Sequence, residues 1–275
     1  MKHIIVPTDF SENAQNAFDY ALHLAKNYQS SITVYHACQI PTSSIHRPAP
    51  RAMEKEKQNI LNETRQKLKT ICEKSRDTGI YCNIEMSVSP VFEGITATSE
   101  KTGADLIVMG TLGASGISRW LFGSTTADVI QNSVIPVLAV PKKASYRPIE
   151  KIVFATDYRD SDFKFISKLV NIASVFQSEL RILHVQTEEG EFRSEALFDS
   201  FRRKVNTLFD YRKTCFHLIE KEDVVDAINN FANDCGADLI SMATSRRNLF
   251  DRIFSKSMTR EMAYITKIPL LAFNS

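Results

Sequence analysis

The chain has 275 residues, which is long for one globular domain and comfortable for two. Apolar residues make up 43% and charged residues 24% of the chain, and the formal net charge is +2, so bulk electrostatics give no indication of nucleic-acid binding. No apolar run approaches the roughly 18 residues of a membrane helix, and the N-terminal residues do not resemble a signal peptide. We therefore expect a cytoplasmic protein with neither a membrane nor a nucleic-acid partner.

The chain contains five cysteines, an odd number, and no C-x-x-C pair. This pattern predicts free thiols in a reducing compartment rather than a disulfide framework or a zinc site. The cysteines are Cys38, Cys72, Cys82, Cys215 and Cys235.

Short apolar runs alternate with amphipathic segments along the first half. A proline-rich loop over residues 39–52 interrupts this alternation once. Alternating strands and helices predict a parallel sheet with helices on both faces. Strands are expected over residues 3–8, 31–38, 82–87, 105–109 and 136–140, and helices over 12–28, 53–76, 90–101 and 127–133.

The same pattern then restarts after a linker over residues 141–148. Residues 151–158 repeat the opening of the chain, so that Asp157 corresponds to Asp9. Residues 236–242 repeat 103–109, and 268–272 repeat 135–139, both at an offset of 133. Such an internal duplication predicts two tandem doubly wound α/β domains, each a five-stranded parallel sheet covered by helices on both faces. The predicted boundaries are 1–143 for the first domain, 144–149 for the linker and 150–275 for the second domain.

The two halves differ in length ahead of the fourth strand. Asp9 precedes Gly110, which follows that strand, by 101 residues, and Asp157 precedes the equivalent Ala243 by 86 residues, a difference of 15. We expect the additional residues in the loop and helix around positions 40–76.

A glycine-bearing loop follows the expected strand at 105–109. Glycines recur at 110, 113, 116 and 123, and three hydroxyl residues, Ser124, Thr125 and Thr126, precede the expected helix. Glycine permits close approach of the backbone to a ligand, and the N–H groups of a helix N-terminus attract anions. Neither the P-loop pattern nor G-x-G-x-x-G is present. From these residues alone, a phosphate cradle and a surface loop with Ser124 as a helix N-cap remain open alternatives.

The spacing Gly110-x2-Gly113-x9-Gly123-Ser124 resembles the ATP-binding signature of the universal stress protein family. Residues 6–11, 103–110 and 135–140 are similar to further segments of that family, in the same order.

This resemblance implies that the first half binds ATP, with Mg²⁺ accompanying the phosphates. It implies that Asp9 accepts hydrogen bonds from the ribose hydroxyls and that the main chain of Ala37 contacts adenine. The remaining implied contacts are Pro7, Thr8 and Met109 lining the pocket, Gly110 and Gly113 beside the ribose and phosphates, and Gly123, Ser124 and Thr125 at the phosphates.

Several of these residues have a purely structural alternative. Asp9 is also placed to favour the dipole of the following helix, and its counterpart Asp157 persists in the second half. His36 and His184 occupy equivalent strand positions, which favours a packing role over catalysis. Cys38 fits a small buried residue better than a reactive thiol. No Asp-x-Asp or His-Glu-x-x-His pattern occurs, so no metal site built from protein ligands alone is expected.

The second half has lost the glycines of the loop. Only Ser257 and Arg252 match their first-half counterparts, Ser124 and Arg119. Side chains at the glycine positions obstruct close approach of the backbone, so we expect this half to keep the fold without the ATP site. The basic loop at 246–256 is either solvated or a site for another anion. The replacements are Ala243 for Gly110, Arg246 for Gly113, Leu249 for Gly116 and Lys256 for Gly123.

Three functions are compatible with this pattern. The first is a nucleotide-responsive stress or signalling protein that is not an enzyme. The second is a slow ATPase or a protein that phosphorylates itself; neither a general base nor a lysine beside the phosphates is apparent. The third is an interaction module without nucleotide. The motifs His-x-Gly-His and Ser-Gly-Gly-x-Asp-Ser of adenylating enzymes of related architecture are absent, and we assign no catalytic residue.

The family resemblance also implies dimerisation through the edge of the fifth strand. The apolar segments 134–140 and 268–273 can pair with each other inside one chain, which predicts an intrachain pseudo-dimer without these two exposed edges. A homodimer of two whole chains is a further possibility.

Overall fold

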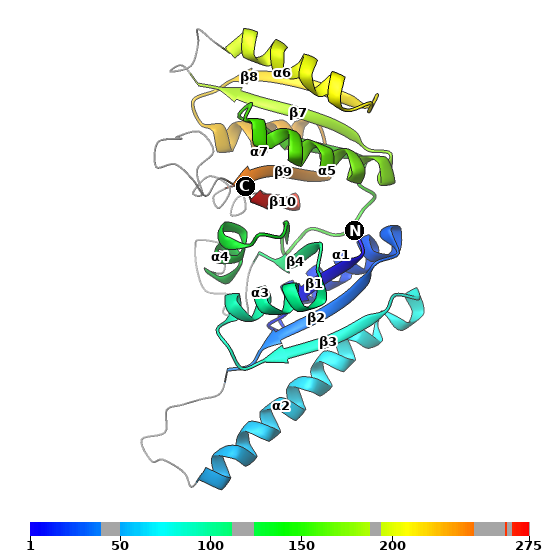
Figure 1. Cartoon of the computed structure of the whole chain (residues 1–275), viewed down its shortest axis with the longest axis vertical. Coiled ribbons are helices and arrows are strands. Elements are labelled where there is room, and N and C mark those ends of the chain that lie inside the picture. Colours follow the sequence, from blue (N-terminus) through cyan, green and yellow to red (C-terminus); the bar gives the residue numbers. More distant parts are fainter. Residues whose placement is uncertain (40–49, 112–123, 188–193, 245–261, 263–265, 275) are drawn as a thin grey trace.

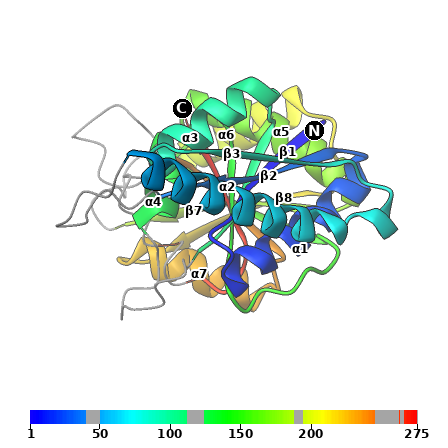
Figure 2. The same ribbon diagram turned by 90° about the horizontal axis from the view of Figure 1, so that it is seen from below.

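The computed structural model is built around one continuous ten-stranded sheet with helices on both faces (Figures 1 and 2). It describes residues 1–39, 50–111, 124–187, 194–244, 262 and 266–274. The strand order is β3-β2-β1-β4-β5-β10-β9-β6-β7-β8. The strands are β1 (His3–Pro7), β2 (Ser31–Ala37), β3 (Cys82–Ser87), β4 (Leu106–Gly110), β5 (Val137–Val140), β6 (Lys151–Ala155), β7 (Glu179–Gln186), β8 (Thr214–Glu220), β9 (Leu239–Thr244) and β10 (Leu270–Asn274).

Side-chain caps mark the starts of two helices. The hydroxyl of Ser11 accepts the N–H of Ala14 at 3.2 Å at the start of α1, and the Asp223 carboxylate accepts the N–H of Asp226 at 2.9 Å at the start of α7. The helices are α1 (Glu12–Tyr28), α2 (Pro50–Glu73), α3 (Val91–Thr102), α4 (Ser124–Asn132), α5 (Asp160–Phe176), α6 (Ser194–Leu208) and α7 (Val224–Asp234), with a short 3-10 turn, η1 (Arg76–Thr78).

The two halves meet at the only antiparallel strand pair among the described strands. Within each half the strands are parallel, whereas β5 and β10 run antiparallel, with Leu271 opposite Leu138. The predicted pairing of the two fifth strands is therefore confirmed. It joins two five-stranded parallel sheets into one and leaves neither fifth strand with an unpaired edge.

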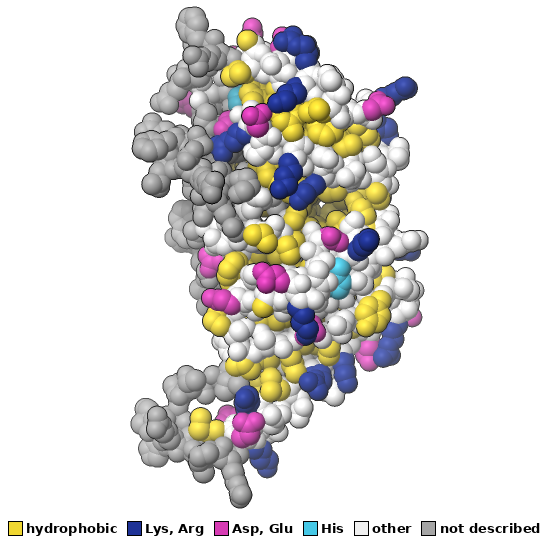
Figure 3. All heavy atoms as spheres, viewed as in Figure 1, with side chains coloured by type: hydrophobic (Ala, Val, Ile, Leu, Met, Phe, Trp, Pro, Cys, Tyr) yellow, Lys and Arg dark blue, Asp and Glu magenta, His cyan; other side chains and the backbone are white. Residues whose placement is uncertain are grey.

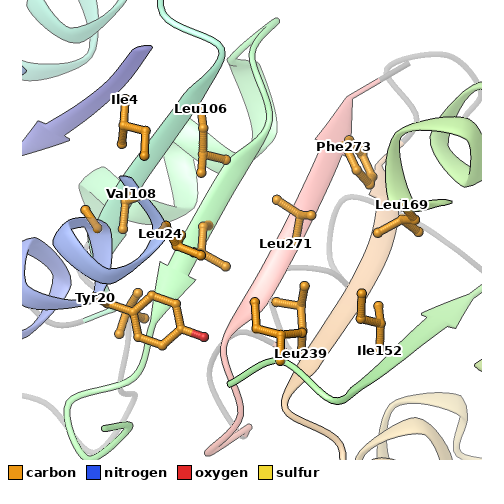
Figure 4. Packing of buried hydrophobic residues seen from close by; sticks show 14 of the residues in the cluster. Ile4, Tyr20, Leu24, Leu106, Val108, Ile152, Leu169, Leu239, Leu271 and Phe273 are labelled. Atoms are coloured by element: carbon orange, nitrogen blue, oxygen red, sulfur yellow. The ribbon is translucent and has the colours of Figure 1, made fainter. Parts of the chain in front are cut away.

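Two hydrophobic cores cover the two faces of this sheet, and both cross the seam between the halves. One core contains residues of α1, α2, α5 and α6, and the other contains residues of α3, α4 and α7. Figure 4 shows the first core near the seam, where Leu106 and Leu271 lie on strands from different halves. Because each core contains residues of both halves, burial of apolar surface stabilises the halves together.

The expected linker is packed against the body of the protein. Ala144 and Ile149 are buried in the first core. The side-chain amide of Asn16 in α1 donates to the carbonyls of Pro141 at 3.1 Å and Ala144 at 2.8 Å. At the other end Arg147 forms an ion pair with Asp238, with an N–O distance of 2.8 Å. The segment between the halves is thus fixed at several points along its length.

The prediction that all five cysteines are free thiols is wrong. Cys72 near the end of α2 and Cys82 at the start of β3 form a disulfide, with a Cα–Cα distance of 5.6 Å. Cys38, Cys215 and Cys235 are free. The chain reverses direction through η1 between the two bonded cysteines, a return that their spacing in the sequence did not reveal. The cysteine content therefore gives no argument for a reducing compartment.

The additional length of the first half lies partly in α2. This helix has 24 residues, whereas its counterpart α6 has 15. Of the α2 side chains that the structure describes, those of Thr64 and Leu68 are buried, and the N-terminal part of the helix extends past the sheet (Figure 1). The helix begins at Pro50 rather than at the expected residue 53, and α4 begins at Ser124 rather than at 127.

The surface carries charges of both signs. Figure 3 shows lysine and arginine side chains interspersed with aspartate and glutamate over the face in view. Among the helices that the structure describes, none combines the length and apolar character needed to cross a bilayer.

Candidate functional site

The candidate site lies where three neighbouring parallel strands end. Strand β1 pairs with β2 on one side and with β4 on the other, and the N–H of Thr8 donates to the carbonyl of Tyr35 at 2.8 Å. Asp9, Ala37 and Gly110 therefore belong to three adjacent strand ends. In parallel sheets of this kind, ligands bind at the carboxyl ends of the strands.

A tight turn after β1 presents Asp9. The hydroxyl of Thr8 accepts the N–H of Phe10 at 3.0 Å, and the Asp9 carboxylate accepts the N–H of Ser11, also at 3.0 Å. Phe10 has a φ of 65°, a left-handed conformation that is costly for a residue with a bulky side chain. The Asp9 side chain is exposed. The turn thus directs the chain from β1 into α1 and leaves a carboxylate accessible at the strand end.

The histidine of β2 supports this turn. The Nδ1 atom of His36 donates to the carbonyl of Thr8 at 2.7 Å, and its ring lies 4.5 Å from that of Phe10. The second half repeats the arrangement, since His184 donates to the carbonyl of Thr156 at 2.8 Å and stacks on a tyrosine ring at 4.1 Å. The packing role predicted for both histidines is confirmed.

Three of the predicted pocket residues are buried apolar residues on adjacent strands. Pro7, Ala37 and Met109 are buried at the ends of β1, β2 and β4. Cys38 is also buried, and its N–H donates to the carbonyl of Ser87 at 2.7 Å. Its surroundings agree with the small structural role expected for it.

Gly110 is required for packing between α1 and β4. A Cβ atom at this position would lie 2.7 Å from the side-chain nitrogen of Asn13 and 2.9 Å from its main-chain oxygen, too close for any residue but glycine without a shift of α1. This reason does not involve a ligand, and sequence reasoning missed it because Asn13 belongs to no motif.

Thr126 ties the start of α4 to the end of β4. Its hydroxyl donates to the carbonyl of Gly110 at 2.9 Å. The first turn of α4, which begins at Ser124 and includes the half-buried Thr125, is thereby held beside the strand end. From the sequence, Thr126 is one of three consecutive hydroxyl residues, but its hydrogen bond to Gly110 was not predicted. Gly113, Gly116, Gly123, Arg119 and Trp120 lie outside the described residues.

The equivalent turn of the second half engages its aspartate differently. Asp157 forms an ion pair with Arg159, with an N–O distance of 3.2 Å. Behind it the buried Asp162 accepts the hydroxyl of Thr156 at 2.7 Å and the N–H of Arg159 at 3.2 Å. Burial raises the pKa of Asp162 above its usual range.

The first half has smaller residues at the corresponding places. Ser11 stands where the second half has Arg159, and Ala14 stands where it has Asp162. The replacement of Gly110 by Ala243 is accompanied by Ser161 in place of Asn13. The basic loop at 246–256, for which an alternative anion was considered, lies outside the described residues.

Among the residues that the structure describes, no three histidine, cysteine, aspartate or glutamate side chains are grouped so that they could hold a metal ion.

Comparison with known proteins identifies the family. The model of the universal stress protein family matches residues 1–141 and again residues 148–274. Universal stress protein MJ0531 of Methanocaldococcus jannaschii is 31% identical over 141 residues, covering 51% of this chain and 82% of that protein. Universal stress protein YxiE of Bacillus subtilis is 31% identical over 144 residues, covering 50% of this chain and 97% of that protein.

A solved structure matches the whole chain. The crystal structure of a universal stress protein from Archaeoglobus fulgidus has a TM-score of 0.75 at 18% identity, covering 99% of this chain and 96% of that one. At this identity the likeness shows the fold. The two matches of the family model establish that the chain belongs to the universal stress protein family and contains two tandem domains of that family.

Proposed function

We propose that the first half binds ATP and that the protein is a nucleotide-responsive stress or signalling protein. One observation carries the proposal: the ends of β1, β2 and β4 are adjacent, and the Thr126–Gly110 hydrogen bond holds the first turn of α4 beside them. A carboxylate, buried apolar residues and a helix N-terminus are thus supplied by neighbouring elements of one half. The resemblance of the glycine spacing at 110, 113 and 123 to the ATP-binding signature of the family adds the ligand class.

The described residues fit a nucleoside. Pro7, Ala37 and Met109 offer apolar surface for a base, and Asp9 offers an exposed carboxylate that can accept hydrogen bonds from ribose hydroxyls. Hydrogen bonds to a charged acceptor are stronger than neutral ones, so Asp9 is expected to contribute much of the selectivity for a sugar with free hydroxyls.

The start of α4 fits phosphate groups. The N–H groups of a first helical turn have no partners within the helix and point toward an anion, and this turn contains Ser124 and Thr125. The proposed phosphate contacts also include Gly113 and Gly123, which lie outside the described residues. Mg²⁺ bound with the nucleotide would neutralise part of the phosphate charge.

We expect binding rather than rapid hydrolysis. The sequence Gly123-Ser124 lacks the lysine that reaches the phosphates in P-loop enzymes. Slow ATP hydrolysis or self-phosphorylation is the alternative, and phosphate release and incorporation of labelled phosphate into the protein distinguish the two.

Calorimetric titration with ATP and Mg²⁺ tests the proposal. Gly113→Arg introduces the side chain that Arg246 places at the equivalent position, and Arg246→Gly is the matched control in the second half. We expect one site per chain in the wild type, no binding by Gly113→Arg, and unchanged stoichiometry for Arg246→Gly. Two sites in the wild type would show that the second half binds as well. No binding would favour the interaction module.

The cytoplasmic location and the homodimer are parts of the same proposal. Cell fractionation tests the location, and analytical ultracentrifugation with and without ATP tests the association of whole chains. A glutathione-buffered cytoplasm would keep much of the Cys72–Cys82 pair reduced, so thiol trapping in cell extracts is an informative companion measurement.

A further inference from the structure

The last residue of β10 contacts the end of a helix in the other half. The side-chain nitrogen of Asn274 donates to the carbonyl of Ile130 at 2.8 Å and to the carbonyl of Ser133 at 2.5 Å. The side-chain oxygen of Asn274 has no hydrogen-bond partner among the described residues, so the two donated bonds set the orientation of the amide. A residue of the second half therefore binds the C-terminal end of α4.

The end of α4 needs such donors. The final carbonyls of a helix have no partner inside it and must be satisfied by other groups. The chain leaves α4 through a short turn in which the Ser133 hydroxyl donates to the carbonyl of Ile135 and accepts the N–H of the same residue. These bonds lie within the turn. The carbonyls of Ile130 and Ser133 instead accept hydrogen bonds from the side chain of Asn274.

The packing of α4 also involves both halves of the chain. Ala127 and Ile130 are buried in a core that also contains Val137 of β5 and Leu270 and Ala272 of β10. The helix thus lies over the seam, and its nine residues span about 13 Å. Its first turn is bound to the first half through Thr126, and its last turn is bound to the second half through Asn274.

The position equivalent to Asn274 in the first half cannot donate the same side-chain bonds. The offset of 133 places Pro141 at the position equivalent to Asn274, and proline has no side-chain donor. In the second half the N–H of Thr266 donates to the carbonyl of Met262, as that of Ser133 does to Val129 in the first. The asparagine therefore serves the helix of the glycine-rich loop and not its counterpart.

We infer that Asn274 is a positioning residue through which the second half fixes α4 and so sets the affinity of the first half for nucleotide. The effect on affinity rests on the function proposed above, whereas the effect on α4 does not. In this proposal the second half supports the position of a nucleotide site that lies in the first half.

Hydrogen exchange on the nucleotide-free protein tests the support directly. Asn274→Ala removes both bonds, and we expect exchange of the amides in the last turn of α4 to rise roughly tenfold. Asn274→Asp keeps the size of the side chain but places a carboxylate against two carbonyls, so the rise should be larger. The aspartate variant also separates lost hydrogen bonds from lost packing if the alanine variant folds poorly.

Asn16→Ala is the matched control. It also removes a side-chain amide that donates to two main-chain carbonyls, those of Pro141 and Ala144, but neither belongs to α4. We expect this variant to lower the melting temperature while exchange in α4 and the dissociation constant for ATP stay at wild-type values. Asn274→Ala should instead raise that dissociation constant about three- to tenfold.

The effect of Asn274 on α4 and its effect on ATP affinity are tested separately. If hydrogen exchange in α4 is unchanged in both Asn274 variants, the inference that Asn274 fixes this helix is wrong. Faster exchange with an unchanged dissociation constant for ATP would overturn the positioning role. A wild-type protein that binds no ATP would overturn the proposed function and the effect on affinity, while the exchange data would still decide whether Asn274 holds α4.

Discussion

The turns after β1 and β6 keep the same backbone and differ in what surrounds their aspartate. Phe10 and Tyr158 both adopt a left-handed conformation, with φ values of 65° and 57°, and both pack against a histidine. Asp9 is nevertheless exposed, whereas Asp157 is paired with Arg159. A retained acid in a duplicated domain is therefore no sign of a retained site. In the second half the acid belongs to an ion pair within its own turn.

The first test extends the comparison of the two halves to the Cys72–Cys82 disulfide. This bond links α2 to β3 in the first half, whereas the cysteines of the second half are free. Replacing Cys72 and Cys82 by serine frees the segment of about ten residues between them, and we expect a loss of about 3 kcal/mol in the free energy of unfolding. Denaturant titration measures the loss. Hydrogen exchange should show the largest effect in α2 and β3, and an equal effect on α6 and β8 would show that the disulfide stabilises both halves as one unit.

The second test removes the carboxylate of each of the two aspartates in turn. Asp9→Ala should weaken ATP binding by about 30-fold, equivalent to about 2 kcal/mol for hydrogen bonds to a charged acceptor. Asp157→Ala should leave ATP binding unchanged and lower stability by about 1 kcal/mol, because the ion pair with Arg159 is lost. Calorimetry and thermal unfolding measure the two effects. If both variants bind ATP equally weakly, the halves share the site.

The third test concerns the glycine that packs against α1. Gly110→Ala should cost about 1–2 kcal/mol of stability, because the new methyl group meets Asn13 at 2.7 Å. Adding Asn13→Ser reproduces the second-half pair, and part of the loss should be restored. The main-chain oxygen of residue 13 remains close, so full recovery is not expected. Additive losses in this double-mutant cycle would argue against compensation.

The smallest effect is expected from pH. Burial lowers the pKa of His184, so the folded state favours the neutral ring, whose Nδ1 donates to Thr156. The unfolded chain then binds more protons than the folded chain at pH values below about 6.5. The stabilising contribution is complete above that pH and decreases as the pH falls toward the lowered pKa.

His184→Gln should accordingly flatten the decrease in stability between pH 7 and pH 5.5. Ring resonances followed by NMR give the titration of each histidine. Burial also lowers the pKa values of His3 and His217, so part of the pH dependence should remain in the variant. A pH profile that is unchanged from wild type would show that His184 does not contribute to the decrease.

Much of the fold was predictable because it depends on local pattern. Apolar runs of strand length, helical periodicity and the offset of 133 gave the element order and the duplication. The pairing of β5 with β10 was predicted from the family resemblance, which implies association through the fifth strand, together with the two apolar edges that such pairing covers. The family resemblance added the ligand, which the spacing of glycines alone left open.

The features that were not predicted depend on contacts between distant residues. The bond between Cys72 and Cys82 requires the chain reversal through η1. The proximity of Asn13 to Gly110 and the bonds from Asn274 to α4 join segments far apart in sequence, and no periodicity encodes them. Arg159 belongs to no motif in the sequence, and its ion pair with Asp157 depends on the geometry of the turn.

The antiparallel β5–β10 pair also changes the rules under which the sequence can vary. When two identical subunits associate through one strand, every substitution appears on both sides of the contact. Covalent continuity removes that constraint, and it also makes the association independent of protein concentration. One copy can then accumulate substitutions such as Arg159 and Ala243 without imposing them on the other. The duplicated chain can thus specialise its two copies, an outcome that a homodimer of single domains cannot reach.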